Sequence, residues 1–121
     1  MGTWGTAIFD DDVAMDARGT FDDALVEGLS VPAATQRVRE EYAEILDDPD
    51  EGPVVRLALA GLQLEQGALQ PGAQREALAV IDQGQGLDRW EEAGEESLAE
   101  RKQVLEAFKA RLRSAPVSPG D

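Results

Sequence analysis

Apolar positions are densest over residues 54–64, where eight of eleven residues are hydrophobic. At 3.6 residues per turn this run is apolar over most of its circumference, so it predicts a helix that is surrounded on most sides. Its polar exceptions, Arg56 and Gln63, are seven residues apart and therefore fall on one line of that helix. The run is too short to span a bilayer. We expect the central helix of a small bundle, beginning near Pro53 and ending near Gly67.

Other segments alternate apolar and polar positions with the period of amphipathic helices, and glycines or prolines separate them. The pattern predicts an all-α fold: an antiparallel bundle of four to five helices with an extended N-terminal segment packed on it. A single helical domain would cover residues 1–113, and the Ser- and Pro-containing residues 114–121 would form a flexible tail. The remaining helices are expected over about residues 12–27, 30–47, 73–83 and 95–113, with a short helical turn over 87–93.

Large aromatic residues near the start of the chain predict how the N-terminal segment is held. Trp4 is flanked by Gly2 and Gly5, which let the backbone approach closely while the ring fills a pocket. We interpret Trp4 and Phe9 as structural anchors of this segment, with Trp90 as a third anchor in the turn near the last helix. The alternative is that the N-terminal aromatic residues form the wall of a ligand site.

The same opening, MGTWGTAIFDDDVAMD, combines a Met-Gly start, a Trp-Gly pair, a Phe and an acidic step into a helix. In this combination it resembles the N-terminal signature of the bacterial domain-of-unknown-function 4259 family. LDRWEEAG, at residues 87–94, also resembles the family, whereas Ala7 departs from a glycine that is frequent there. The resemblance implies no established activity and no catalytic residues. The residues that carry it at the N-terminus are Met1, Gly2, Trp4, Gly5, Phe9, Asp11, Asp12, Ala14 and Asp16.

Composition narrows the classes of function. There are 25 acidic and 11 basic residues, for a net charge of −14, which disfavours nucleic acids and anionic membranes as partners and suits a basic protein. The absence of Cys and His removes thiol chemistry and the ordinary Ser-His triad. We therefore predict no catalytic residues and no cofactor. Without a recognisable signal peptide or transmembrane segment, we expect a cytoplasmic location.

Charge is also distributed unevenly. Residues 1–52 hold fourteen acidic and three basic residues, whereas residues 101–113 hold five basic residues and one acidic residue. Because opposite charges attract, we expect the last helix to lie near acidic residues of the first half.

Three aspartates form the leading candidate for a binding site. Asp12, Asp16 and Asp23 share one line of the first predicted helix with Gly19, opposite its apolar face. This ridge is either a solvated face or the receptor for a basic group, with Gly19 allowing close approach. A cation site involving Asp10 is a weaker interpretation. We predict that the three aspartates bind a basic protein, in an interaction module of the immunity or antitoxin kind.

A divalent-metal site is the alternative. Glu40, Glu41 and Glu44 form an E-E-x-x-E pattern that is similar to the magnesium-binding half-motif of all-α nucleotide pyrophosphohydrolases. That chemistry requires a second carboxylate pair on the next helix, where this chain offers only Glu65. The corresponding function would be a divalent-metal-binding protein or a degenerate nucleotide hydrolase.

Overall fold

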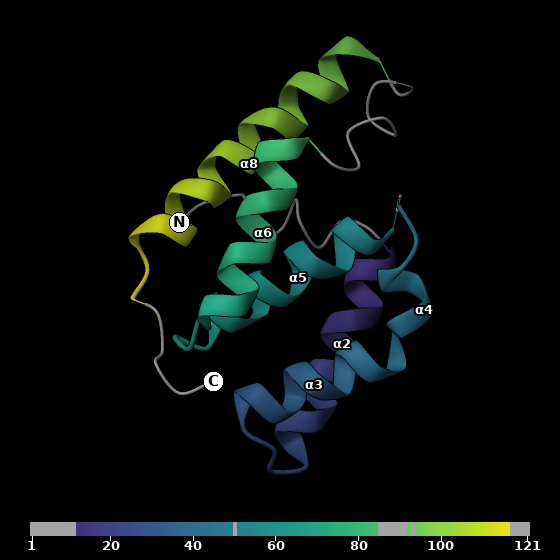
Figure 1. The fold of residues 1–121 in the computed structure, drawn as a ribbon, viewed down its shortest axis with the longest axis vertical. Coiled ribbons are helices and arrows are strands. Elements are labelled where there is room, and N and C mark those ends of the chain that lie inside the picture. The colour runs from purple at the N-terminus through teal and green to yellow at the C-terminus, as the bar shows by residue number, and fades with distance from the viewer. Residues whose placement is uncertain (1–11, 50, 85–91, 93, 117–121) are drawn as a thin grey trace.

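The computed structural model describes residues 12–49, 51–84, 92 and 94–116. The described helices and the absence of a strand among these residues confirm the all-α bundle (Figure 1). The predicted anchors Trp4, Phe9 and Trp90 lie outside the described residues, as does the N-terminal segment itself. The helices are α2 over Asp12–Val26, α3 over Val31–Glu41, α4 over Ala43–Leu46, α5 over Gly52–Glu65, α6 over Pro71–Gln83 and α8 over Glu95–Ser114.

Helix α5 is the centre of the fold, as its apolar run predicts. It lies between the α2–α3 pair and the α6–α8 pair in Figure 1, and it packs against α2, α4 and α6. From Gly52 to Gln63 every residue except Arg56 is buried. Burying a Val or Leu side chain contributes roughly 1.5–3 kcal/mol, so this helix supplies a large share of the hydrophobic stabilisation. None of the helices in the described ranges is long and apolar enough to cross a membrane.

The end of α2 turns the chain so that α3 packs back against it. Gly28 adopts a φ of 98°, in the left-handed region that glycine tolerates best. Its N–H donates to the Leu25 carbonyl, and the Leu29 N–H donates to the Ala24 carbonyl, both at 3.0 Å. These two bonds form a Schellman motif. Ser30 then caps α3 by accepting a hydrogen bond from the backbone of the first turn.

The segment predicted as one helix over residues 30–47 is divided in two. Tyr42, with φ −109° and ψ 23°, interrupts the helix between α3 and α4. The break redirects the chain so that the short α4 packs against α5. Apolar periodicity continues through the break, which is why the sequence pattern predicts a single helix.

The last helix also differs from its prediction at two points. It runs to Ser114, and Ala115 packs against the core before taking an extended conformation ahead of Pro116. Ser114 therefore belongs to α8 and Ala115 is its C-cap, whereas residues 117–121, most of the predicted tail, lie outside the description. Among the described helices α8 packs mainly on α6, with Lys109 2.5 Å from Asp82, and residues 1–11 of the acidic first half lie outside the description. Its buried Leu105, Phe108 and Leu112 decide this placement, because burial outweighs surface ion pairs.

Candidate functional site

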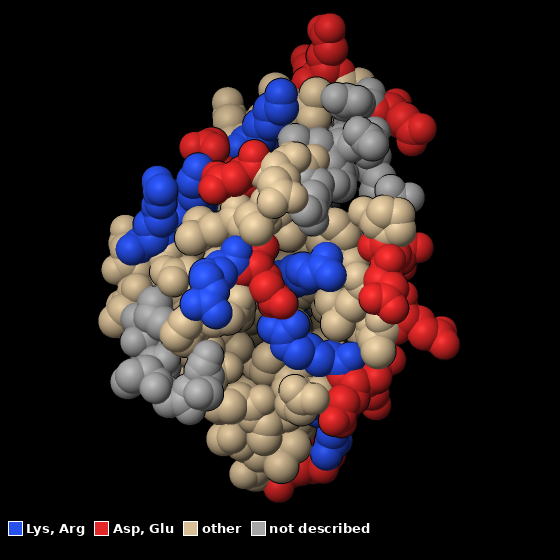
Figure 2. Space-filling view, in the orientation of Figure 1, with Lys and Arg blue, Asp and Glu red and all other residues tan. Residues whose placement is uncertain are grey.

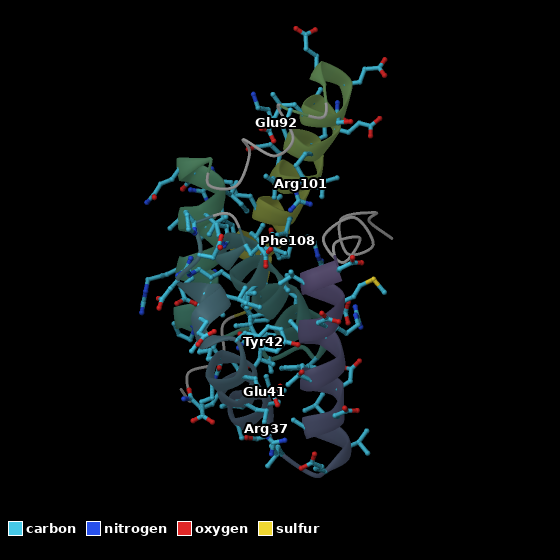
Figure 3. All side chains as sticks on the ribbon, turned by 90° about the vertical axis from the view of Figure 1, so that its right-hand side faces the viewer. Arg37, Glu41, Tyr42, Glu92, Arg101 and Phe108 are labelled. Atoms are coloured by element: carbon cyan, nitrogen blue, oxygen red, sulfur yellow. The ribbon has the colours of Figure 1, made fainter. Side chains whose placement is uncertain are left out.

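The outward side of α2 brings the three predicted aspartates together. The opposite side of this helix buries Phe21 and three alanines against α3 and α5. Figure 3 shows α2, in purple, at the right-hand edge with side chains projecting away from the other helices. We define the α2 outer face as the exposed residues Asp12, Met15, Asp16, Gly19, Asp22, Asp23 and Val26.

The aspartates of this face are not neutralised within the described part of the chain. Asp12, Asp16 and Asp23 form no ion pair or side-chain hydrogen bond with any described residue. Gly19 lies between them, and a Cβ atom placed on it would have no atom of a described residue within 4 Å. The face is therefore anionic and sterically open at its middle.

The basic residues of the first half are engaged elsewhere. Arg18 of α2 places Nη2 2.6 Å from Oε2 of Glu65 in α5. Arg39 reaches Glu76 of α6 through two hydrogen bonds, of 2.6 and 3.2 Å. The third, Arg37, lies 3.5 Å from Glu27, the residue after the end of α2. The three basic side chains of residues 1–52 are thus paired with Glu65, Glu76 and Glu27, and none of them is paired with an aspartate of the α2 outer face in the described residues.

Two exposed apolar side chains accompany the aspartates. Met15 is 56% exposed and Val26 is 87% exposed, and they are the large hydrophobic residues that stand out to solvent in the described ranges. Sequence reasoning missed them because it sorted α2 into an apolar stripe and an acidic ridge. Helical spacing could have predicted their exposure, because both residues lie on the acidic side of the helix rather than on the buried side. The α2 outer face thus combines negative charge with two exposed apolar side chains.

The alternative site at the E-E-x-x-E pattern is interrupted by the helix break. Glu40 and Glu41 belong to α3, whereas Glu44 belongs to α4, beyond the non-helical Tyr42. Glu41 lies in the seam between α2 and α3 (Figure 3), where its Oε2 accepts a hydrogen bond of 3.1 Å from the Thr20 hydroxyl. In the ranges that the structure covers, no group of three or more Asp or Glu side chains is placed to hold a metal ion.

Acidic side chains also gather outside α2. Figure 2 shows them along the edge of the molecule occupied by α4, while Lys and Arg side chains lie over α8 and the middle of this face. Glu40, Glu44, Asp47 and Asp48 are exposed residues of the α3–α4 region. Basic groups are therefore intermixed with acidic ones on this side of the molecule.

A buried polar cluster was not predicted from the sequence. Gln63, one of the two polar exceptions in the central run, has no solvent exposure. Its Nε2 donates to Thr35 Oγ1 at 2.9 Å and to Gln70 Oε1 at 3.1 Å, and its Oε1 accepts from the Gln70 N–H at 2.9 Å. Arg56, the other exception, donates to the Leu46 carbonyl at 3.1 Å. These contacts join helices and leave no buried side-chain polar atom without a partner in the described residues, so they are structural.

No family model, no curated protein and no solved structure matches this chain. The resemblance to the domain-of-unknown-function 4259 family therefore remains a prediction, and most of the residues that carry it precede the described region. The candidate site rests on geometry and charge, and the α2 outer face is the surface that both favour.

Proposed function

We propose that this chain is a small cytoplasmic interaction module, of the immunity or antitoxin kind, that binds a basic protein through the α2 outer face. The observation that carries the proposal is the exposure of Asp12, Asp16 and Asp23 without a basic partner in the described residues. An uncompensated acidic surface attracts a basic protein and accelerates its association.

The construction of α2 also suits binding. Phe21 and three alanines fix this helix against α3 and α5, so its outer side chains are presented from a rigid backbone. Pre-organisation of this kind lowers the entropy cost of association. Met15 can contact the aliphatic stem of a partner Arg or Lys whose charged end reaches an aspartate. Gly19 lets the partner approach the helix closely.

A matched pair of double variants tests the proposal. D16N/D23N removes two charges from the α2 outer face, and E96Q/E100Q removes two from exposed positions at the start of α8. The tagged wild type and both variants would be used to capture partners from the native cells, with mass spectrometry for identification and titration calorimetry on the recovered protein. We expect D16N/D23N to weaken binding by roughly tenfold or more, and E96Q/E100Q to leave it within about twofold.

Folding and salt provide the controls. Circular dichroism should show the same helix content and melting temperature for all three proteins, because both pairs of side chains are exposed. Binding of the wild type should weaken as salt concentration rises. Equal loss in the two variants would indicate unspecific attraction by net charge. Full retention of binding by D16N/D23N would exclude the α2 outer face.

A further inference from the structure

A pocket of about 240 Å³ lies where the C-terminal ends of α5 and α8 meet. Leu64 and Leu69 line it, and Leu69 is buried while Leu64 is half-buried. Arg111 and Ser114 of α8 and the following Ala115 also line it. The pocket therefore has an apolar part and one basic lining residue, Arg111, and none of these residues belongs to α2.

One charged donor at this pocket has no hydrogen-bond partner among the described residues. The carbonyl oxygen of Arg111 accepts from the Ala115 N–H at 3.0 Å, and that of Leu112 accepts from Gln74 Nε2 at 2.7 Å. These carbonyl groups at the end of α8 are thus already hydrogen-bonded. The Arg111 guanidinium, by contrast, has no hydrogen bond or ion pair to any residue that the structure describes.

The α8 side of the pocket is basic although the whole chain carries a net charge of −14. The sequence from residue 107 to residue 116 contains Lys109, Arg111 and Arg113 and no acidic residue, and no residue that lines the pocket is acidic. Lys109 is paired with Asp82, which leaves Arg111 as the basic group at the pocket. At physiological ionic strength, repulsion from surface carboxylates is largely screened beyond roughly 8 Å.

We propose that this pocket binds a small amphipathic carboxylate. The aliphatic part would pack against Leu64 and Leu69, and the carboxylate would meet the planar fork of Arg111, whose N–H groups match two carboxylate oxygens. The volume lies below the range of roughly 300–1,000 Å³ that drug-sized ligands occupy, so a short acyl chain fits better than a larger molecule.

Three ligands with one tail and different head groups test this assignment. Octanoate, octanol and octylammonium would be titrated into the isotope-labelled full chain, with amide chemical shifts as the readout. We expect octanoate to bind with a Kd of about 1 mM or tighter, which a ligand of this size can reach. Octanol should bind roughly tenfold more weakly because it lacks the charged hydrogen bonds, and octylammonium should bind more weakly still. The amides of Leu64, Leu69 and Ala115 should shift.

The matched variants are R111Q in the pocket and R113Q two residues further along, which is exposed and does not line it. R111Q should weaken octanoate binding roughly tenfold and leave octanol unchanged, whereas R113Q should change neither. Four outcomes would overturn the proposal: no saturable binding of octanoate, equal affinity for the three ligands, shifts confined to another surface, or equal losses in R111Q and R113Q.

Discussion

At the scale of single residues, Gln63 shows how a polar side chain can stabilise an apolar core. It is enclosed by α3, α5 and the start of α6, and it exchanges three hydrogen bonds with Thr35 and Gln70. Gln70 is also the N-cap residue of α6, where its extended backbone starts the helix. The side chain of Gln63 therefore fixes how the α5–α6 connection sits on the core.

The substitution Gln63→Leu keeps most of the volume and removes all three hydrogen bonds. The buried N–H and side-chain oxygen of Gln70 then lose their partner, and each such loss costs about 1–3 kcal/mol. We expect urea unfolding to show a destabilisation of about 2–4 kcal/mol with an unchanged m value. Gln66→Leu, at an exposed position in the next turn, should change stability by less than about 0.5 kcal/mol. Similar values for the two variants would contradict a role for the buried cluster.

Two helical glycines should respond to alanine in opposite directions. A Cβ atom at Gly52 would lie 2.5 Å from the Leu46 backbone oxygen, so Gly52→Ala forces α4 and α5 apart and should destabilise the fold. At Gly19 a Cβ atom meets open space, and Gly19→Ala should stabilise α2 by about 0.5–1 kcal/mol through helix propensity. Thermal unfolding of both variants tests this, and a stabilising Gly52→Ala would contradict the close packing of α4 on α5.

At the scale of elements, the periodicity of apolar residues predicts the buried side of each helix. The apolar run over residues 54–64 became α5, and Ala14, Ala17, Phe21 and Ala24 became the buried side of α2. Periodicity carries no information about hydrogen-bond partners that are distant in sequence. Periodicity therefore placed Gln63 on a polar line of the helix without predicting its burial. It also predicted one continuous helix across Tyr42, where the structure has a break that lets α4 pack against α5.

The candidate site likewise has one part that the sequence predicts and one part that only the tertiary structure shows. The common line of Asp12, Asp16 and Asp23 follows from helical spacing, and their exposure agrees with it. That the three arginines of the first half pair with Glu65, Glu27 and Glu76 is a property of the tertiary structure. The sequence alone therefore does not show which acidic residues of the first half lack a basic partner among the described residues; the tertiary structure does.

The helix break leads to a prediction about metal binding. Because Glu40 and Glu41 are separated from Glu44 by Tyr42, these carboxylates do not share one continuous helical face. We expect calorimetry to show Mg²⁺ and Mn²⁺ binding weaker than about 1 mM, and Glu44→Gln to leave it unchanged. Binding tighter than this in the wild type, abolished by Glu44→Gln, would instead support the divalent-metal alternative.

At the scale of the whole molecule, a net charge of −14 does not define a binding surface by itself. Acidic residues are exposed both on α2 and in the α3–α4 region, and the latter side also carries basic groups (Figure 2). What separates the α2 outer face is a combination of three features: aspartates without a partner among the described residues, the open position at Gly19, and the exposed Met15 and Val26. We therefore assign partner binding to α2 rather than to negative charge in general.

The most direct test of this assignment is the hydrogen-exchange footprint of the captured basic partner on the wild-type protein. Amide exchange would be compared between the free chain and the complex at the same pH and salt concentration. We predict slower exchange over Asp12–Val26 in the complex and unchanged exchange over Val31–Glu41 and Ala43–Leu46. Protection confined to α3 and α4, with α2 exchanging as in the free protein, would contradict the account.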